Sequence, residues 1–276
     1  MSTLREILRT AENYLKQHAI ADADVDAWYL LVHVFGINRA EFYLHREEEA
    51  SKIQEEAYWT LVEQRAKHIP LQLITGTQEF MGLEFAVTSD VLIPRQDTEV
   101  LVEGVLKVCS QKSVLDMCTG SGCIIISLSK YGNLSKAVGV DLSEKALKVA
   151  EINAVKHNLN IEFIKSNLFE KIEGVYDIVV SNPPYIPSGE IQSLMPEVRD
   201  HEPIMALDGD LDGLAFYRKI AKEGKDHLIK NGYIFLEIGC NQAQDVKEIL
   251  QKEGFCDIKI KKDLSGLDRV VSGRRF

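Results

Sequence analysis

The sequence predicts an α/β protein, with a small α-helical domain ahead of a larger domain built on a parallel β-sheet. Two observations support this prediction. Apolar residues recur at helical spacing through about the first 70 residues. From about residue 112 onward, strand-like and helix-like segments alternate along the chain. Such alternation is typical of a parallel sheet covered by helices on both faces, because parallel strands need a crossover connection between them.

Composition and charge narrow the class of protein. The 276 residues suffice for one large or two modest domains, and 45% apolar with 27% charged residues indicates ordered cores. The five scattered cysteines form no C-x-x-C pair, and no apolar run approaches the ~18 residues of a membrane span. We therefore expect a cytoplasmic protein without disulfides, a metal ion or membrane contact. The net charge of −10 favours a protein or small-molecule substrate over a nucleic acid.

The first domain is expected to be a small bundle, because short amphipathic helices cannot bury their apolar faces alone. Its helices are expected over about residues 4–15, 25–35 and 50–68. The third helix is expected to carry on one face Ile53, Ala57, Leu61 and Arg65. A β-hairpin that turns near Met81 and Gly82 is expected to follow. Residues 73–92 would then link a helical domain of residues 1–72 to a larger domain of residues 93–276.

The larger domain is expected to contain seven strands. They are predicted at residues 113–117, 136–142, 161–166, 176–186, 232–239, 256–264 and 267–276. Helices are predicted between them at residues 123–131, 143–158, 213–230 and 242–253. Ser143 is the expected N-cap of the second of these helices.

A glycine-containing turn follows the first strand of this domain and opens a helix. It consists of Cys118, Thr119, Gly120, Ser121 and Gly122, directly after the strand that contains Asp116. Glycines let a backbone approach a ligand closely, and a helix N-terminus offers free N–H groups. The third glycine of the dinucleotide fingerprint is absent, since Ile125 occupies its position, and no phosphate-binding G-x-x-x-x-G-K loop is present. By itself the turn is equally compatible with an ordinary strand–turn–helix unit.

Asp141 lies at the end of the next strand, where a carboxylate can accept hydrogen bonds from both hydroxyls of a ribose. The glycine turn and this acid together suit a cofactor that contains adenosine. Because the phosphate-binding motifs are absent, S-adenosylmethionine is favoured over NAD, FAD and ATP. The alternative role for Asp141 is that of a helix cap or a surface acid.

The tetrapeptide Asn182-Pro183-Pro184-Tyr185 follows an apolar strand and is the most specific motif in the chain. Its prolines fix φ and lack N–H donors, so they form a rigid turn at the end of the strand where open α/β sheets bind ligands. The Asn182 side-chain oxygen and the Pro183 carbonyl can accept both hydrogens of a planar –NH₂ group, and Tyr185 can pack against its π-system. The alternative is a rigid proline loop without a chemical role.

An amide or aromatic amine nitrogen is a poor nucleophile because its lone pair is delocalised. Two acceptors on its hydrogens would raise the electron density on nitrogen and orient it toward a methyl donor. Orientation of this kind can contribute ~7–11 kcal/mol of barrier lowering. The methylated product is acidic, so the sequence predicts acceptors in the site and no strong general base.

These motifs, read together, resemble the release factor glutamine methyltransferases (the HemK/PrmC family), and the resemblance covers nearly the whole chain. The tetrapeptide alone is shared with DNA and RNA amine methyltransferases. The wider set of matching segments lies at residues 93–99, 116–122, 140–143, 181–187, 202–207, 212–218, 237–239 and 268–271. The resemblance implies a Rossmann-like, seven-stranded, S-adenosylmethionine-dependent methyltransferase domain behind the helical domain.

The resemblance also implies a substrate and roles for individual residues. The substrate would be the Gly-Gly-Gln glutamine of a class I release factor, methylated on its side-chain amide and held by Asn182, Pro183, Pro184 and Tyr185. The cofactor would contact the residues of the glycine turn, Asp141 and Asn182, with Leu168 beside the adenine. The helical domain would dock the release factor, and residues 94–99 would line the cleft. Glu237 could face the cofactor cleft or form a salt bridge.

Three other functions are compatible with parts of the pattern. A glutamine of a ribosomal protein could accept the methyl group by the same chemistry. A nucleic-acid amine could also be the acceptor, although the net charge of −10 disfavours a nucleic-acid substrate. A catalytically silent module that binds the translation machinery is the third alternative, and the intact tetrapeptide argues against it.

Overall fold

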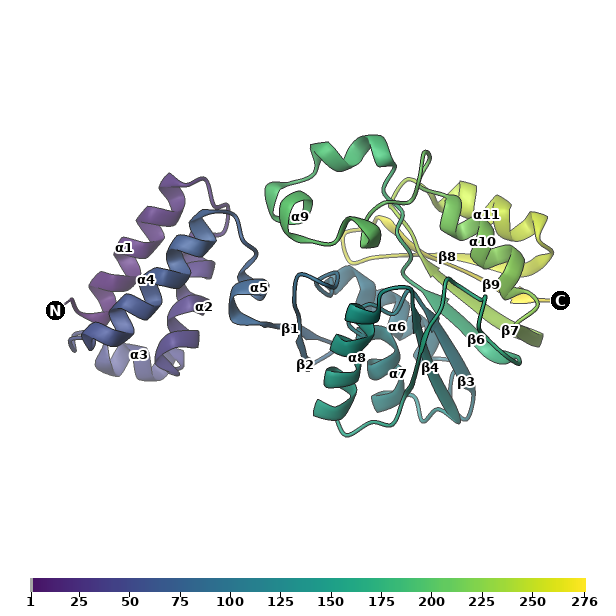
Figure 1. Ribbon diagram of the computed structural model, residues 1–276, viewed down its shortest axis with the longest axis horizontal. Coiled ribbons are helices and arrows are strands. Elements are labelled where there is room, and N and C mark those ends of the chain that lie inside the picture. The colour runs from purple at the N-terminus through teal and green to yellow at the C-terminus, as the bar shows by residue number, and fades with distance from the viewer. Residues whose placement is uncertain (1) are drawn as a thin grey trace. The chain divides into compact units, whose positions relative to one another are not determined.

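The computed structural model describes residues 2–276, which form two compact units (Figure 1). The first unit comprises Met1–Gly76 and Met195–His201, and the second comprises Thr77–Leu194 and Glu202–Phe276. The sequence analysis expected residues 73–92, which include the hairpin, to be a linker between two domains. In the structure the hairpin is instead the first part of the second unit. Met195–His201 packs with the helices although it lies far along the chain. Within residues 2–276 no helix has both the length and the apolar character to cross a bilayer.

The first unit is entirely helical. Its helices are α1 (Leu4–Gln17), α2 (Ala23–Phe35), α3 (Arg39–His45), α4 (Lys52–Ala66), α5 (Leu71–Thr75) and α9 (Pro196–His201). The short α3 was not predicted, and the side chains of Asn38 and Glu41 form a capping box at its start. The apolar faces of α1, α2 and α4 meet in one core, as expected for a bundle.

The buried face of α4 differs from the expected one. Ile53 is 81% exposed, whereas Tyr58 and Val62 are fully buried with Arg65. Both sets of residues have helical spacing, so periodicity alone could not choose between them. Tyr58 settles the choice because its hydroxyl donates a 2.9 Å hydrogen bond to the carbonyl of Ala27 in the core. The predicted face is therefore wrong for Ile53 and Ala57, which are both exposed, and correct for Arg65; Leu61 is half-buried.

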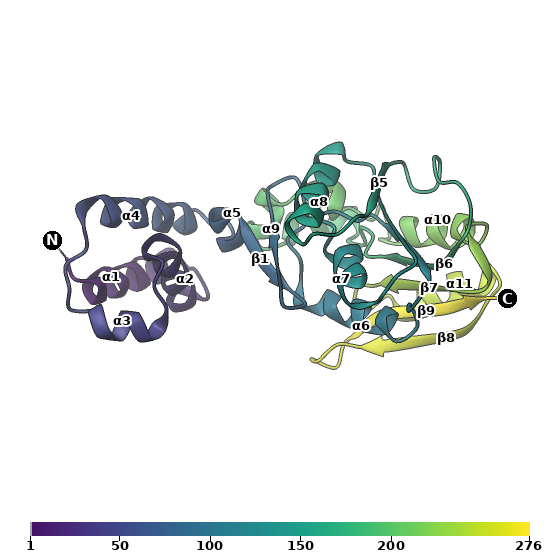
Figure 2. The same ribbon diagram turned by 90° about the horizontal axis from the view of Figure 1, so that it is seen from below.

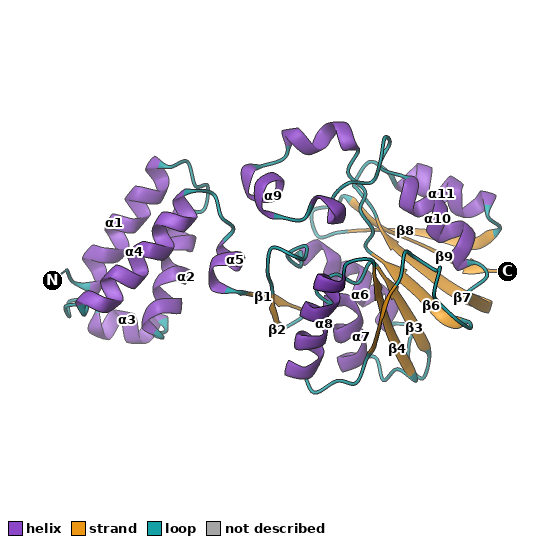
Figure 3. Ribbon diagram, viewed as in Figure 1, coloured by secondary structure: helices purple, strands orange, loops and turns teal. Residues whose placement is uncertain are grey.

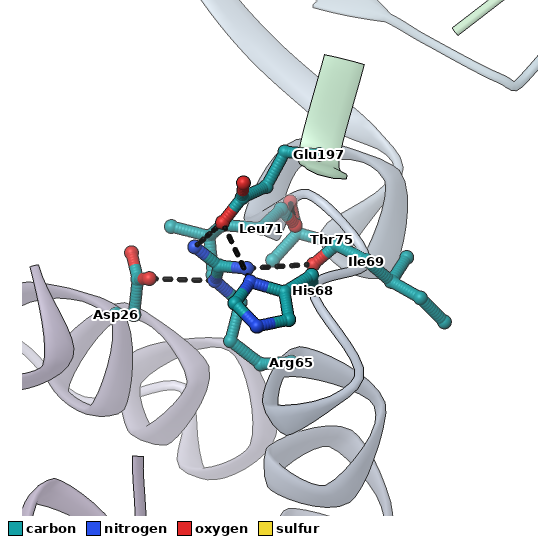
Figure 4. Close-up of polar contacts among 7 residues, drawn as sticks. All are labelled: Asp26, Arg65, His68, Ile69, Leu71, Thr75 and Glu197. Atoms are coloured by element: carbon teal, nitrogen blue, oxygen red, sulfur yellow. Dashed lines mark hydrogen bonds and ion pairs between the residues drawn. The ribbon is translucent and has the colours of Figure 1, made fainter. Parts of the chain in front are cut away.

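Arg65 lies at the centre of a polar cluster that joins α9 to this bundle (Figure 4). Its Nε donates to Asp26 Oδ2 at 2.6 Å, and its Nη2 donates to Glu197 Oε1 at 3.1 Å. A third bond runs from Nη1 to the carbonyl of Ile69, and His68 Nδ1 lies 3.3 Å from the same Glu197 oxygen. Burial raises the pKa of Asp26 although the hydrogen bond from Arg65 acts in the opposite direction. The ion pair therefore holds a desolvated carboxylate inside the bundle.

The second unit is built on a seven-stranded sheet in the order β5-β4-β3-β6-β7-β9-β8. The strands are β3 (Ser113–Met117), β4 (Lys136–Asp141), β5 (Glu162–Lys165), β6 (Tyr176–Ser181), β7 (Leu228–Glu237), β8 (Phe255–Lys262) and β9 (Asp268–Arg275). The five strands from β5 to β7 run parallel, while β9 pairs antiparallel with both β7 and β8. This hairpin forms one edge of the sheet (Figure 2). The predicted number of strands and the α/β class are confirmed.

Helices cover both faces of the sheet (Figure 3). One face packs against α10 (Ala215–Gly224) and α11 (Ala243–Lys252). The other packs against α6 (Glu99–Leu106), α7 (Cys123–Tyr131) and the end of α8 (Glu144–Lys156). Neighbouring residues of β3 point to opposite faces of the sheet. Leu115 packs in the core with α10 and α11, and Val114 packs in the core with α6 and α7. Ser143 caps α8 as predicted, since its hydroxyl accepts the N–H of Ala146.

A hairpin of β1 (Thr77–Phe80) and β2 (Leu83–Ala86) begins this unit. Its two-residue turn is Met81-Gly82, at the predicted position, and both residues have positive φ, at 52° and 70°. Such a turn matches the right-handed twist of the strands, which explains the glycine. Phe80 and Phe85 are buried in the same core as the apolar residues of α6 and α7, so the hairpin packs as part of the second unit.

The Arg65 cluster yields a test of the bundle. Arg65→Met leaves the buried Asp26 carboxylate without its ion partner, so the free energy of unfolding should fall by about 3–5 kcal/mol. Arg5→Met is the matched control, because Arg5 is exposed beside Glu47 and should change stability by less than about 0.5 kcal/mol. Both tryptophans of the chain, Trp28 and Trp59, lie in this unit, so fluorescence during urea unfolding reports on it directly. Equal stability of the two variants would contradict this role of Arg65.

Candidate functional site

A cavity of the second unit opens at the carboxyl ends of the parallel strands. Here the strand order reverses, because the chain runs outward from β3 to β4 and β5, and then returns to β6 on the other side of β3. Open α/β sheets bind ligands at this reversal point. The cavity has a volume of about 540 Å³, which is the size of a site for a drug-sized ligand. Its wall contains residues that follow β3, β4, β5 and β6.

The glycine turn forms one wall of the cavity through Cys118, Thr119, Gly120 and Ser121. Cys118, Gly120 and Gly122 all have positive φ, between 55° and 80°. A Cβ on Gly120 would have no atom within 4 Å, so its backbone borders open space. A Cβ on Gly122 would lie 2.9 Å from Ile126 and 3.1 Å from Ala150, so this glycine permits close packing of α7 against α8. Gly122 itself does not line the cavity.

Asp141 lies on the adjacent wall and is held by two backbone donors. Its Oδ2 accepts the N–H of Gly120 and its Oδ1 accepts the N–H of Ser143, both at 2.9 Å. Burial raises the pKa of Asp141, and these bonds act in the opposite direction. A carboxylate has about four acceptor positions, so these backbone bonds leave Asp141 able to accept from a ligand. Asp141 is therefore a fixed acceptor in the wall of the cavity.

Asp116, near the end of β3, stabilises the glycine turn through a hydrogen bond with Thr119. Its Oδ2 accepts the hydroxyl of Thr119 at 2.6 Å, while Oδ1 is buried without a hydrogen-bond partner among residues 2–276. Burial raises the pKa of Asp116 to about 7, and the nearby Asp141 carboxylate contributes to this shift. The Thr119 hydroxyl joins the turn to the end of β3.

The tetrapeptide after β6 is divided between the cavity and the core. Asn182 and Pro184 line the cavity, whereas Pro183 and Tyr185 do not. The Tyr185 ring packs against the core beside α10 and α11, and its carbonyl accepts a 2.9 Å hydrogen bond from Gln242. Burial raises the pKa of Tyr185 to about 12, so the phenol is neutral at physiological pH.

The remaining walls include Leu168 and part of residues 94–99. Leu168 is buried with a φ of 48° and lines the cavity. From residues 94–99, Pro94, Arg95 and Thr98 line it as well. Arg95 donates to both carboxylate oxygens of Glu202, at 2.6 and 2.8 Å. This bidentate pair fixes the loop against the chain just before Pro203, another residue of the wall.

The contacts of two buried side chains near the cavity were not predicted from the sequence, although Thr98 belongs to the 94–99 segment that was expected to line the cleft. Asn153 is fully buried in α8, where its side chain bonds the backbone of Ala86 in both directions and the carbonyl of Ser121 at 2.9 Å. It thereby joins the glycine turn to the hairpin. Thr98 is also buried, 3.4 Å from the Asn182 amide nitrogen. A lone Asn or Thr inside a helical segment gives no sequence signal, because its partners lie far along the chain.

Comparisons with known proteins agree with this architecture. The family model described as the PrmC N-terminal domain matches residues 6–76, and that of the methyltransferase small domain matches residues 95–197. The release factor glutamine methyltransferase of Geobacter sulfurreducens is 40% identical over 99% of this chain and 96% of its own length. The protein of the same name from Clostridium acetobutylicum is 43% identical over 89% of each chain.

A solved structure shares the fold of the larger unit. It is a methyltransferase from Pyrococcus furiosus with a TM-score of 0.56 and 20% identity, and the match covers 71% of this chain and 90% of that one. At this identity the likeness concerns the fold alone. The near full-length identity to the curated relatives carries the assignment: the chain belongs to the release factor glutamine methyltransferase family.

Proposed function

We propose that this protein transfers a methyl group from S-adenosylmethionine to the side-chain amide nitrogen, N5, of a glutamine. The acceptor is the glutamine of the Gly-Gly-Gln motif in a class I release factor, and the reaction takes place in the cytoplasm. The observation that carries the proposal is the position of Asn182 in the cavity wall, on the strand next to the one that carries the glycine turn. The curated relatives bear the name of this activity.

The cavity fits the proposed cofactor by its chemistry. Asp141 is a fixed carboxylate acceptor in the cavity wall, which suits the hydroxyls of a ribose. Leu168 offers an apolar surface for the adenine, and the backbone at Gly120 borders open space that a ligand can occupy. When bound, S-adenosylmethionine would supply an electrophilic methyl group on a sulfonium. A dinucleotide would need room and donors for its phosphates, which the two-glycine turn does not provide.

Asn182 and Pro183 would hold the acceptor amide. The Asn182 Oδ1 atom and the Pro183 carbonyl each accept one hydrogen of the glutamine –NH₂, which orients the nitrogen toward the methyl group. Pro184 forms part of the wall, and Tyr185 supports the turn from the core side. The carbon–nitrogen bond forms as the carbon–sulfur bond breaks, and the extra proton then leaves the nitrogen. Because the protonated product is strongly acidic, water suffices as the proton acceptor.

Replacing Asn182 tests the proposed acceptor role. Asn182→Ala removes one of the two acceptors, so kcat for methylation of a release factor should fall ~10²–10³-fold, as for other positioned catalytic dipoles. Asn160→Ala is the control. Asn160 is exposed and precedes the amino end of β5, whereas the cavity lies at the carboxyl ends of the parallel strands. Its kcat should stay within about two-fold of wild type. Near-wild-type turnover by Asn182→Ala would exclude the proposed role.

Replacing Asp141 tests the cofactor site. Asp141→Asn turns one acceptor oxygen into a donor, so the affinity for S-adenosylmethionine should fall by ~10-fold or more, given ~1.5–3 kcal/mol for each charge-assisted bond. Isothermal titration calorimetry measures this directly. Glu144→Gln is the matched control, because Glu144 lies just beyond Asp141 in the sequence, is exposed at the start of α8 and pairs with Lys165 outside the cavity. Equal affinities of the two variants would refute the assignment of Asp141.

A further inference from the structure

Glu237 is a buried carboxyl group next to Asn182 that the proposed reaction does not use. It is the last residue of β7 and is 2% exposed. Its neighbour Leu236 is paired with Ser181 in the parallel ladder, so Glu237 and Asn182 follow in step on adjacent strands. Its Oε2 atom has no hydrogen-bond partner among residues 2–276. Burying a carboxyl group in this way is unfavourable unless the group is paired or protonated, so its presence beside the site needs an explanation.

The polar neighbours of Glu237 restrict how Asn182 can be oriented. Side-chain hydrogen bonding by Thr98 and Asn182 lowers the pKa of Glu237 against the effect of burial, so both neighbours favour the ionised carboxylate. The Asn182 Nδ2 atom also donates to Thr98 Oγ1 at 3.4 Å. A threonine hydroxyl has a single hydrogen, so if it donates to Glu237 it can only accept from Asn182. An ionised carboxylate only accepts as well. Thr98 and Glu237 therefore both require a donor from Asn182, which only the –NH₂ end of its amide can supply.

The opposite end of the Asn182 amide is its carbonyl oxygen, Oδ1. Because Asn182 lines the cavity, fixing Nδ2 toward Thr98 and Glu237 leaves Oδ1 for a ligand. We propose that ionised Glu237, acting with Thr98, is a positioning group that holds the Asn182 amide with its oxygen toward the methyl-acceptor nitrogen. This inference rests on the proposed role of Asn182 in methyl transfer. Without such positioning, the amide could turn over and present a donor to the –NH₂ of the substrate, which would repel it.

The ionisation of Glu237 gives the proposal a pH dependence. Burial raises the pKa of Glu237 to about 7. Arg269 on β9 lowers this pKa, and Asp97 raises it. The other titratable groups that face it are Tyr185, Tyr217 on α10 and Cys123 on α7. The charged form fixes the amide, so the positioning is complete above the pKa of Glu237 and is lost as the pH falls through it. Protonated Glu237 carries an O–H that can donate to Oδ1 and so tolerates the reversed amide.

A spectroscopic test needs neither substrate nor cofactor. The side-chain –NH₂ of Asn182 is assigned in a ¹⁵N spectrum of the full chain by its loss in Asn182→Ala, and is followed from about pH 5 to about pH 9. We expect its resonances to titrate with one transition in the wild type and to be independent of pH in Glu237→Gln, which keeps the shape of the side chain. A pH-independent resonance in the wild type, or the same transition in Glu237→Gln, would overturn the proposal.

Kinetics separate positioning from a merely structural role. Above the pKa of Glu237, Glu237→Gln and Thr98→Val should each lower kcat ~10-fold or more, since misplacement of a reacting group by about 1 Å can cost ~100-fold. Thr98→Ser keeps the hydroxyl and should stay within about two-fold of wild type. Calorimetric affinity for S-adenosylmethionine should be unchanged in all three. If Thr98→Val matched Thr98→Ser, or if the loss appeared in cofactor affinity instead of kcat, the positioning role would be excluded. Absence of methylation by the wild type would instead refute the proposed function, and the spectroscopic test would still stand.

Discussion

The parallel pairing of β3 with β6 is the constraint on which the site depends. In this ladder Met117 is opposite Ser181, and the buried Ser181 hydroxyl donates a 2.6 Å hydrogen bond to the Met117 carbonyl. The two strands therefore end together, at the point where the strand order reverses. One continues into the glycine turn, which holds Asp141 through the N–H of Gly120. The other continues into Asn182. A shift of either strand by one residue would turn every side chain to the opposite face and separate the two halves of the site.

The connections between the two units also follow from packing. The chain passes between them after Gly76, after Leu194 and after His201. The short stretch that belongs to the helical unit is held by Glu197, which bonds to the buried Arg65. On either side of it in the sequence lie cavity residues, Pro184 before and Pro203 after. In the sequence, the stretch that packs with the helical unit therefore lies between two segments that contribute residues to the cavity.

Much of this architecture could be predicted from the sequence because it rests on local signals. The turn at Met81-Gly82 demands positive φ, Ser143 caps a helix through its own hydroxyl, and the apolar strands alternate with helices. What could not be predicted rests on contacts between distant residues. The burial of Tyr58 in preference to Ile53 depends on the carbonyl of Ala27. The place of Glu197 in the helical unit depends on Arg65, far earlier in the chain.

The candidate site also combines residues that local sequence signals predict with residues whose roles depend on contacts between distant parts of the chain. The glycine turn, Asp141 and the tetrapeptide were predicted from motifs and spacing, and the structure brings residues of all three to one cavity, although Pro183, Tyr185 and Gly122 are not among the residues that line it. The contacts of Thr98 and Asn153, and the relation of Glu237 to Asn182, emerge only when the strands and helices are assembled. Mass spectrometry of a class I release factor, incubated with this protein and S-adenosylmethionine, tests the central claim most directly. The account predicts one added methyl group on the Gly-Gly-Gln glutamine; an unmodified glutamine, with methyl transfer instead to a ribosomal protein or to RNA, would contradict it.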